Sequence, residues 1–452
     1  MSSVQRVAPF ESRVAVGLGG GLLGFTFTVL GLLFLISAQL DGFLVVAFLV
    51  PVLLAASWPA FTRQARRERD PSLVTLLVTA LLLKLFGSLV RYWVAVAFYD
   101  SNADAFEYHR VGVDLAMRFR AGNFDTGLAS LSGTDFISFF TGIVYTITGP
   151  SIFAGFLLYS WLAFGGMFYM YRAFTIAVPD GNKRSYARLL FFMPSMLYWP
   201  SSIGKEAWML FTLGIAAWGA ALVLRYRSRG YVVLGLGLAG TAAVRPHITL
   251  LLFVALFIAY LWRRRSWLES RSGLLGRMAG IGLMVLVGGL VLTQAADFFH
   301  LQDLDPAGVQ QVLDRTQDQS SKGASQFSVS RPKSPGEYPD AVLTVLFRPY
   351  PWEAGNAQAL VASVEGTLLA LLFVVSLPRL ARLPRLLVST PYLLFAVAYI
   401  LMFVFAFSSV GNFGIITRQR TQVFPFVLVL LALPLPVRER ESEKLAAVAP
   451  PA

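Results

Sequence analysis

Two aspartates, Asp100 and Asp104, lie in an acidic stretch, YDSNADAFEYHR (99–110), that follows a long apolar run. A carboxylate at a water interface is a candidate general base that can take a proton from a hydroxyl group. If the segment is helical, the two side chains lie one turn apart on one face. We therefore predict Asp104 as the base and Asp100 as the residue that orients a hydroxyl or a metal ion. The alternative is a solvated helix start, where acidic residues are favoured.

Four further polar groups interrupt the apolar runs, in WPSSIGKEAW, AAVRPHITL, LFRPYPWEAGNAQALVASVEG and GNFGIITRQRTQVFPF. Several of their cations suit a phosphate or pyrophosphate, to which arginine offers bidentate contacts. The predicted phosphate-binding residues are Arg348, Arg418, Arg420, Lys205 and Arg245. The predicted contacts to the remainder of the ligand are Glu206, His247, Trp352, Glu353 and Asn356.

Each group also has a purely structural explanation. Lys205 and Glu206 could pair with each other, and Trp352 could be an interfacial anchor, the commonest use of tryptophan in membranes. Three histidines in the chain make a histidine metal triad implausible, and the absence of cysteine excludes a disulfide framework and a thiolate zinc site.

The composition defines the class of protein that must position these residues. The 452 residues are 56% hydrophobic and only 14% charged, whereas soluble domains carry about 25% charged residues. Apolar runs of the length that crosses a ~30 Å hydrocarbon core recur along the chain. We predict an all-α polytopic membrane protein. The net charge of +13 then reflects loops that set orientation, and a nucleic-acid partner is not expected.

Twelve spans are expected, and the loops between alternate pairs, such as RQARRERD and RRRSWLESRSGLLGR, are rich in arginine. The positive-inside rule places these loops and both termini in the cytoplasm. The run 136–150 is short, and we interpret it as a re-entrant or interfacial element. The expected spans are 14–38, 43–61, 73–98, 151–171, 189–202, 206–224, 231–246, 248–262, 279–297, 358–378, 387–408 and 421–437.

Two segments outside the spans are expected on the extracytoplasmic face. In 99–135, Phe106, Val113, Met117 and Arg120 recur at roughly helical spacing, which indicates an interfacial helix. In 298–347, a helix is expected after Asp305, and the Ser-, Gly- and Pro-rich part that follows is expected to be flexible or ordered by substrate. The expected divisions are 1–98 (N-terminal helices), 99–150 (acidic loop), 151–297 (central helices), 298–357 (second loop), 358–437 (C-terminal helices) and 438–452 (cytoplasmic tail).

All five polar groups fall at the outer ends of the expected spans. Placing a charge at membrane depth costs at least about 2.5–3.5 kcal/mol at a helix centre, so five such groups on one face predict a shared polar cavity that opens outward. A ligand that is both a lipid and a phosphate would lie at this level. A sugar linked to a polyprenyl phosphate fits that description.

The stretch FYDSNADAFEYHRVGVDLAMRFR resembles the GT-C class of integral membrane glycosyltransferases, in which an acidic outer loop after an early membrane helix precedes an interfacial helix. Here the loop follows the third expected span instead of the first. The resemblance implies a cell-membrane enzyme with an extracytoplasmic active face, a polyprenyl-linked sugar donor, a saccharide acceptor and contacts with membrane lipids. Some members need a divalent metal, which Asp104, Glu107 and His109 could help to bind.

The stretches FRPYPWEAGNAQALVASVEG and GNFGIITRQR also resemble O-antigen-type polysaccharide polymerases, which use outward arginines on lipid pyrophosphates. A transporter or flippase of a lipid-linked saccharide is a third alternative, favoured by Lys84 and Arg91 within an expected span, although Lys84 could snorkel. No internal repeat is visible, which disfavours many transporter classes. A non-catalytic subunit of an envelope machine is a fourth alternative.

Overall fold

The computed structural model describes residues 43–97, 103–263, 282, 288–296, 299, 306–320, 325–329, 331–332 and 334–434. Asp100, the span expected at 14–38 and the tail at 438–452 lie outside these residues, as does part of the span expected at 279–297. Across the described residues the chain is helical and contains no β-strand, although an isolated antiparallel bridge joins Gln326 and Asn412. The predicted all-α class is therefore confirmed for this part of the chain.

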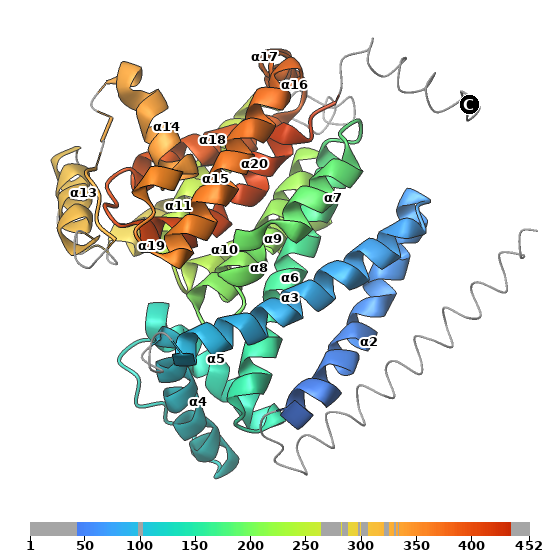
Figure 1. Cartoon of the computed structure of the whole chain (residues 1–452), viewed down its shortest axis with the longest axis vertical. Coiled ribbons are helices and arrows are strands. Elements are labelled where there is room, and N and C mark those ends of the chain that lie inside the picture. The colour runs from blue at the N-terminus through green and yellow to red at the C-terminus, as the bar shows by residue number, and fades with distance from the viewer. Residues whose placement is uncertain are drawn as a thin grey trace, which may run out of the picture. The chain divides into compact units, whose positions relative to one another are not determined.

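The chain forms two compact units, and the first contains the described residues up to Phe164 together with Pro200–Ala207. Its described helices are α2 (Phe43–Glu68), α3 (Ser72–Ala97), α4 (Asp104–Arg120), α5 (Gly133–Thr148), the first half of α6 (Ile152–Ala177) and the first residues of α9 (Lys205–Leu224) (Figure 1).

The second unit contains Gly165–Trp199 and the described residues from Trp208 onward. Within it α11 packs against α18, and α18 packs against α20. Besides the remainder of α6 and α9, its helices are α7 (Lys183–Phe192), α8 (Pro194–Tyr198), α10 (Arg229–Ala242), α11 (Pro246–Trp262), α13 (Pro306–Ser320), α14 (Tyr338–Phe347), α15 (Ala357–Val375), α16 (Leu377–Leu380), α17 (Leu383–Ser389), α18 (Pro391–Phe407), α19 (Phe413–Gln419) and α20 (Phe424–Leu431), with short 3₁₀ turns η1 (Pro335–Glu337), η2 (Pro351–Glu353) and η3 (Arg420–Gln422).

Five described helices are long and apolar enough to cross a membrane, namely α2 from Val45 onward, α3, α6, α9 and α15. The pair α17 and α18, bent by 117°, makes a sixth if it counts as one span. These helices fall on six of the expected spans and are those of a helical membrane protein. The spans expected at 231–246 and 248–262 fall on α10, with 14 residues, and α11, with 17. The total of twelve spans stays a prediction.

The segment expected to span at 189–202 does not form one helix. It is divided between α7 and α8, because Pro194 lacks an N–H donor and its ring disfavours helical geometry in the residue before it. Met193 is accordingly extended, with a ψ of 125°. The expected span at 421–437 likewise contains only the eight residues of α20 as regular α-helix among its described residues.

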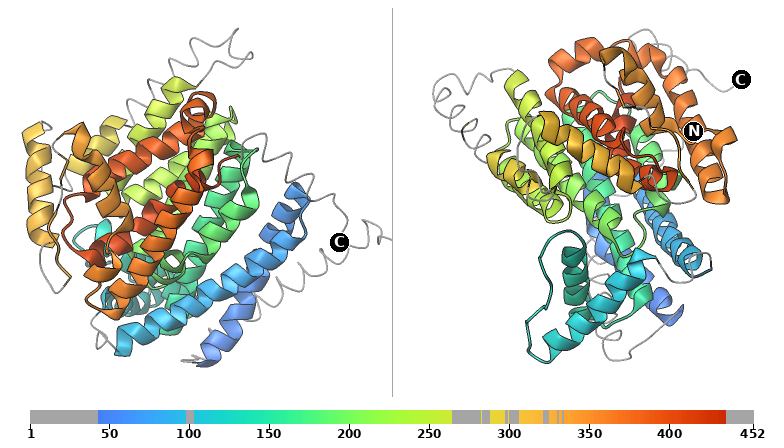
Figure 2. Two further views of the ribbon diagram at one scale, coloured as in Figure 1. Left: turned by 45° about the horizontal axis from the view of Figure 1, so that its top comes forward. Right: turned by 90° about the vertical axis from the view of Figure 1, so that its left-hand side faces the viewer.

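Helices α4 and α5 form a closely packed pair in the first unit, drawn in teal in Figure 2. A Cβ at Gly112 of α4 would lie 2.6 Å from Thr141 Cγ2 of α5, so only glycine permits this approach. The helix predicted within 99–135 is confirmed as α4, and its expected position at the membrane interface stays a prediction. Tyr108 and Leu115 lie on the buried face of α4, and Leu115 packs against Gly142 of α5. Met117, on the face predicted to meet the interface, is 59% exposed.

Close backbone packing also joins α6 to α9 in the second unit. A Cβ built at Gly214 would overlap the Gly166 carbonyl oxygen, which is backbone and cannot turn aside. Small residues allow membrane helices to approach in this way and to gain van der Waals contact where no hydrophobic driving force exists between helices.

We expect Gly214→Ala to destabilise the protein by about 1–3 kcal/mol, because the added methyl group forces the two backbones apart. The matched control is Gly235→Ala in α10, where a Cβ meets nothing within 4 Å and alanine favours the helix. Thermal unfolding in detergent measures both. Equal midpoints for the two variants would show that α6 and α9 do not pack as described.

Candidate functional site

In the first unit, the described acidic residues of the stretch 99–110 lie on α4. Asp104 is the first residue of the helix and is exposed, and Glu107 lies in the same turn. Glu107 forms an exposed ion pair with Arg110 at 2.7 Å, and this hydrogen bond lowers the Glu107 pKa. His109 Nδ1 lies 2.8 Å from the Tyr145 hydroxyl on α5.

The metal set suggested for this loop does not assemble among the described residues. Both Glu107 oxygens accept from Arg110, and one nitrogen of His109 contacts Tyr145. No group of three or more His, Cys, Asp or Glu side chains that could hold a metal ion occurs in the described part of the chain. We therefore assign no step to a metal.

Lys205 and Glu206 begin α9 and belong to the same unit as α4. The Glu206 carboxylate and the Tyr108 ring of α4 both lie within 4 Å of the point where a Cβ at Gly204 would stand. Tyr108 lies one helical turn after Asp104. Three of the predicted residues, Asp104, Lys205 and Glu206, are thus placed in one unit, with Glu206 close to the helix that carries the aspartate.

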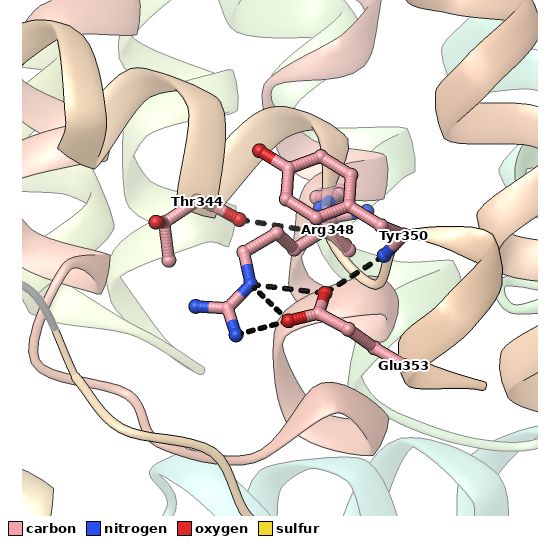
Figure 3. A network of polar contacts seen from close by, with 5 residues as sticks. Thr344, Arg348, Tyr350 and Glu353 are labelled. Atoms are coloured by element: carbon pink, nitrogen blue, oxygen red, sulfur yellow. Dashed lines mark hydrogen bonds and ion pairs between the residues drawn. The ribbon is translucent and has the colours of Figure 1, made fainter. Parts of the chain in front are cut away.

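A separate, basic cluster belongs to the second unit and centres on Arg348, directly after α14. Its Nε and Nη2 donate to the Glu353 carboxylate, with Nε 3.0 and 3.1 Å from the two oxygens, and the Tyr350 amide donates to the same carboxylate at 2.8 Å (Figure 3). The pair is largely buried, with side-chain exposures of 16% and 20%. Nη1 of Arg348 points away from Glu353 in Figure 3, so its two N–H groups can face a ligand.

Two aromatic rings lie close to the Arg348 guanidinium. The Arg348 guanidinium lies 4.5 Å from the Phe327 ring centre and 5.4 Å from that of Phe413, and the two rings stack on each other. On the chain after Arg348, Tyr350 stacks on Trp352, whose side chain is 81% exposed. An exposed indole beside a guanidinium and a carboxylate offers an apolar face and polar groups to one ligand.

Glu353 should make stability pH-dependent. Burial raises its pKa, but the hydrogen bonds from Arg348 and the Tyr350 amide outweigh burial and hold the pKa below its ordinary value. A lowered pKa in the folded state gives stabilisation that is present above the unfolded pKa of about 4.3 and is lost as pH falls through the folded value.

Glu353→Gln should therefore lower the unfolding temperature near neutral pH, and its difference from the wild type should shrink between about pH 5 and pH 3. Thermal unfolding across this range measures the effect. The control Glu337→Gln, in the exposed turn η1, should change little at any pH. A deficit for Glu353→Gln that stayed constant with pH would contradict ionisation of Glu353 as its cause.

Arg420 is 3% exposed, and its side chain stabilises the fold through hydrogen bonds to backbone carbonyls. Its Nη2 donates to the backbone carbonyls of Arg348 and, at 3.4 Å, Thr344, and its Nε donates to that of Val345. These carbonyls end α14 and lack partners within the helix. The Arg420 charge thus caps α14 and places Arg348, so we assign Arg420 a positioning role in place of the predicted direct contact with phosphate.

Arg245 precedes α11, is 8% exposed and donates to the Gln419 side chain. Gln419 also accepts from Gln422. Because Gln419 adjoins Arg420, the three arginines Arg245, Arg348 and Arg420 form one connected region of the second unit. Their convergence on one phosphate stays a prediction.

The other predicted residues have more ordinary positions. Asn356 is the N-cap of α15, where its side chain accepts from the Ala359 amide at 2.8 Å. His247, in the first turn of α11, lies 5.3 Å from the Phe299 ring. Arg418 lies on α19 and is half-buried. None of these positions identifies a ligand.

Several residues of this region were not predicted from the sequence, notably Gln419, Phe327 and Phe413. The spacing of Gln419 and Gln422 within TRQRTQ was a usable signal, because polar side chains three apart share one helical face. The two phenylalanines gave no such signal. They meet because the backbone around Phe327 pairs with residues 411–413, through bonds such as Phe327 N to Gly411 O at 3.1 Å.

No protein-family model matches this chain, and neither a curated protein nor a solved structure does.

Proposed function

We propose that this protein is a membrane glycosyltransferase that moves a sugar from a polyprenyl-phosphate donor to an acceptor outside the cytoplasm. The observation that carries the proposal is the Arg348–Glu353 pair with the exposed Trp352 beside it. A guanidinium can hold a phosphate, a carboxylate can accept from sugar hydroxyls, and an indole can cover the apolar face of a sugar ring. The pair lies between α14 and α15, a candidate membrane span.

The reaction is an inverting transfer. The Asp104 carboxylate takes the proton of an acceptor hydroxyl as that oxygen forms its bond to the anomeric carbon. The bond from the anomeric carbon to the donor phosphate oxygen breaks at the same time, and the polyprenyl phosphate leaves with the electron pair. Within the second unit, Arg348 can bind a lipid phosphate through Nη1, the guanidinium nitrogen that does not contact Glu353.

Incubation of the purified full-length protein with labelled polyprenyl-phosphate sugars and candidate acceptors tests the proposal. Release of polyprenyl phosphate together with a labelled glycoside is the expected result. Failure with every donor and acceptor offered, by protein that is folded on thermal unfolding, would remove the monophosphate-donor function.

The second candidate is a polysaccharide polymerase that acts on lipid-pyrophosphate repeat units. Arg245, which is joined through Gln419 to the region of Arg348, favours it, because a second cation near Arg348 suits the greater negative charge of a pyrophosphate. Growth of long chains from a lipid-pyrophosphate oligosaccharide, without turnover of monophosphate donors, would select this candidate.

A further inference from the structure

A groove of about 450 Å³ runs along α15 in the second unit. Its walls come from α7, α8, α15 and α20, and they are apolar except for Glu365 and Arg188. Along α15 it extends from Leu360 to Leu372. With a rise of 1.5 Å per residue this distance is about 18 Å, close to half of a ~30 Å hydrocarbon core. The groove therefore has the length of a lipid chain in one leaflet.

The groove opens on the side of α15 that faces its surroundings. Val361 is 61% exposed and Leu368 is 55% exposed, and both line the groove. Because α15 is a candidate membrane span, an apolar surface of this kind meets lipid chains in the bilayer.

One end of the groove is basic. Arg188 lines it, and Arg184 precedes Arg188 by one turn on the same face of α7. Both side chains are exposed. A lipid phosphate at this end would meet two guanidinium groups, which favour bidentate contacts with phosphate.

The helix directions place this basic end at the last turns of α15. The start of α7 contacts the end of α20, where Asn182 N donates to Ala432 O at 2.9 Å. The segment after α15 contacts the same end, where Arg379 Nη1 donates to Leu431 O at 3.0 Å. Helices α7 and α15 therefore run in opposite directions, and the arginine end of the groove lies toward Leu372.

The carboxylate in the groove, that of Glu365, would not repel an anion bound at Arg188. Glu365 is 8% exposed, and its two oxygens accept from the amide and the hydroxyl of Ser195, the amide at 3.0 Å. Ser195 lies seven residues beyond Arg188 along the chain, and Glu365 lies seven residues before Leu372. The carboxylate thus marks the middle of the groove, where a phospholipid has only hydrocarbon.

We propose that this groove binds an anionic glycerophospholipid, with one acyl chain along α15 and the phosphate group at Arg184 and Arg188. Basic residues near a membrane attract anionic lipids, and basic pockets between membrane helices bind their headgroups. The site lies on residues that take no part in the proposed transfer, and it does not rest on that function.

Photo-crosslinking tests the proposal with the full-length protein in vesicles of phosphatidylcholine. The probe is phosphatidylglycerol with a diazirine in one acyl chain, and the matched probe is phosphatidylcholine with the same chain. Labelled peptides are located by mass spectrometry. We expect phosphatidylglycerol to label the peptides around 188–194 and 360–372 well above phosphatidylcholine. Arg184→Gln and Arg188→Gln should each reduce this labelling about fivefold.

Val364→Trp, which fills the groove, should abolish labelling at these peptides. The control Val374→Trp, on α15 but outside the lining, replaces a 61% exposed valine and should label like the wild type. Equal labelling by the two probes, or an unchanged signal in Arg188→Gln, would overturn the anionic-lipid assignment. Undiminished labelling in Val364→Trp would overturn the groove as the site. Sugar transfer is not a readout, so a failure of the proposed function leaves this test intact.

Discussion

Asp104→Asn should lower the turnover of sugar transfer about 10²–10⁴-fold at saturating donor, which is the usual contribution of a general base. Asparagine has nearly the shape of aspartate but cannot take a proton from the acceptor hydroxyl. Asp104 is exposed at the first residue of α4, so expression and unfolding temperature should stay close to those of the wild type. Release of labelled polyprenyl phosphate measures the turnover.

Asp114→Asn on the same helix is the matched control. Asp114 forms an exposed ion pair with Arg118 at 2.8 Å, and such pairs contribute little to stability. Its variant should transfer sugar normally. The variant Asp100→Asn distinguishes the roles of the two aspartates. A large loss of turnover in Asp100→Asn, with normal turnover in Asp104→Asn, would make Asp100 the base and Asp104 the orienting residue. Near-normal turnover in both variants would show that the acidic stretch is only a solvated helix start. That result would favour the polymerase candidate.

Arg348→Lys should weaken the binding of the lipid-phosphate donor by about tenfold or more, since one charged hydrogen bond contributes about 1.5–3 kcal/mol. Lysine keeps the positive charge but loses the planar fork. It cannot hold Glu353 through two nitrogens and present a third to phosphate at the same time. The concentration dependence of sugar transfer on donor measures the effect.

Arg385→Lys, at an exposed position on α17, is the matched control and should leave donor binding unchanged. Thermal unfolding separates a structural loss from a binding loss, because Arg348 also stabilises the turn that carries Glu353. A variant Arg348→Lys with normal donor dependence would remove Arg348 from the phosphate site. The ion pair would then be a structural link between α14 and α15.

Local sequence patterns were enough to predict many of the helices. The apolar runs at 73–98 and 358–378 became α3 (Ser72–Ala97) and α15 (Ala357–Val375), because burial of twenty or so consecutive apolar residues in a membrane satisfies both the side chains and the helical backbone. The start of α13 at Pro306 followed from the preference of proline for the first turn. The same preference of proline divides the segment expected to span at 189–202, because α8 begins at Pro194.

The roles of the charged residues depended on contacts between distant parts of the chain. The sequence alone determined that Arg245, Arg348 and Arg420 are unusual charges in an apolar protein. Only the tertiary structure decided that Arg420 caps α14 from more than seventy residues away and that Arg348 pairs with Glu353 against Phe327 and Phe413. The physical reason is that a helix forms from neighbours in sequence, whereas the cost of a buried charge is met by whichever carbonyl, carboxylate or ring the fold brings beside it.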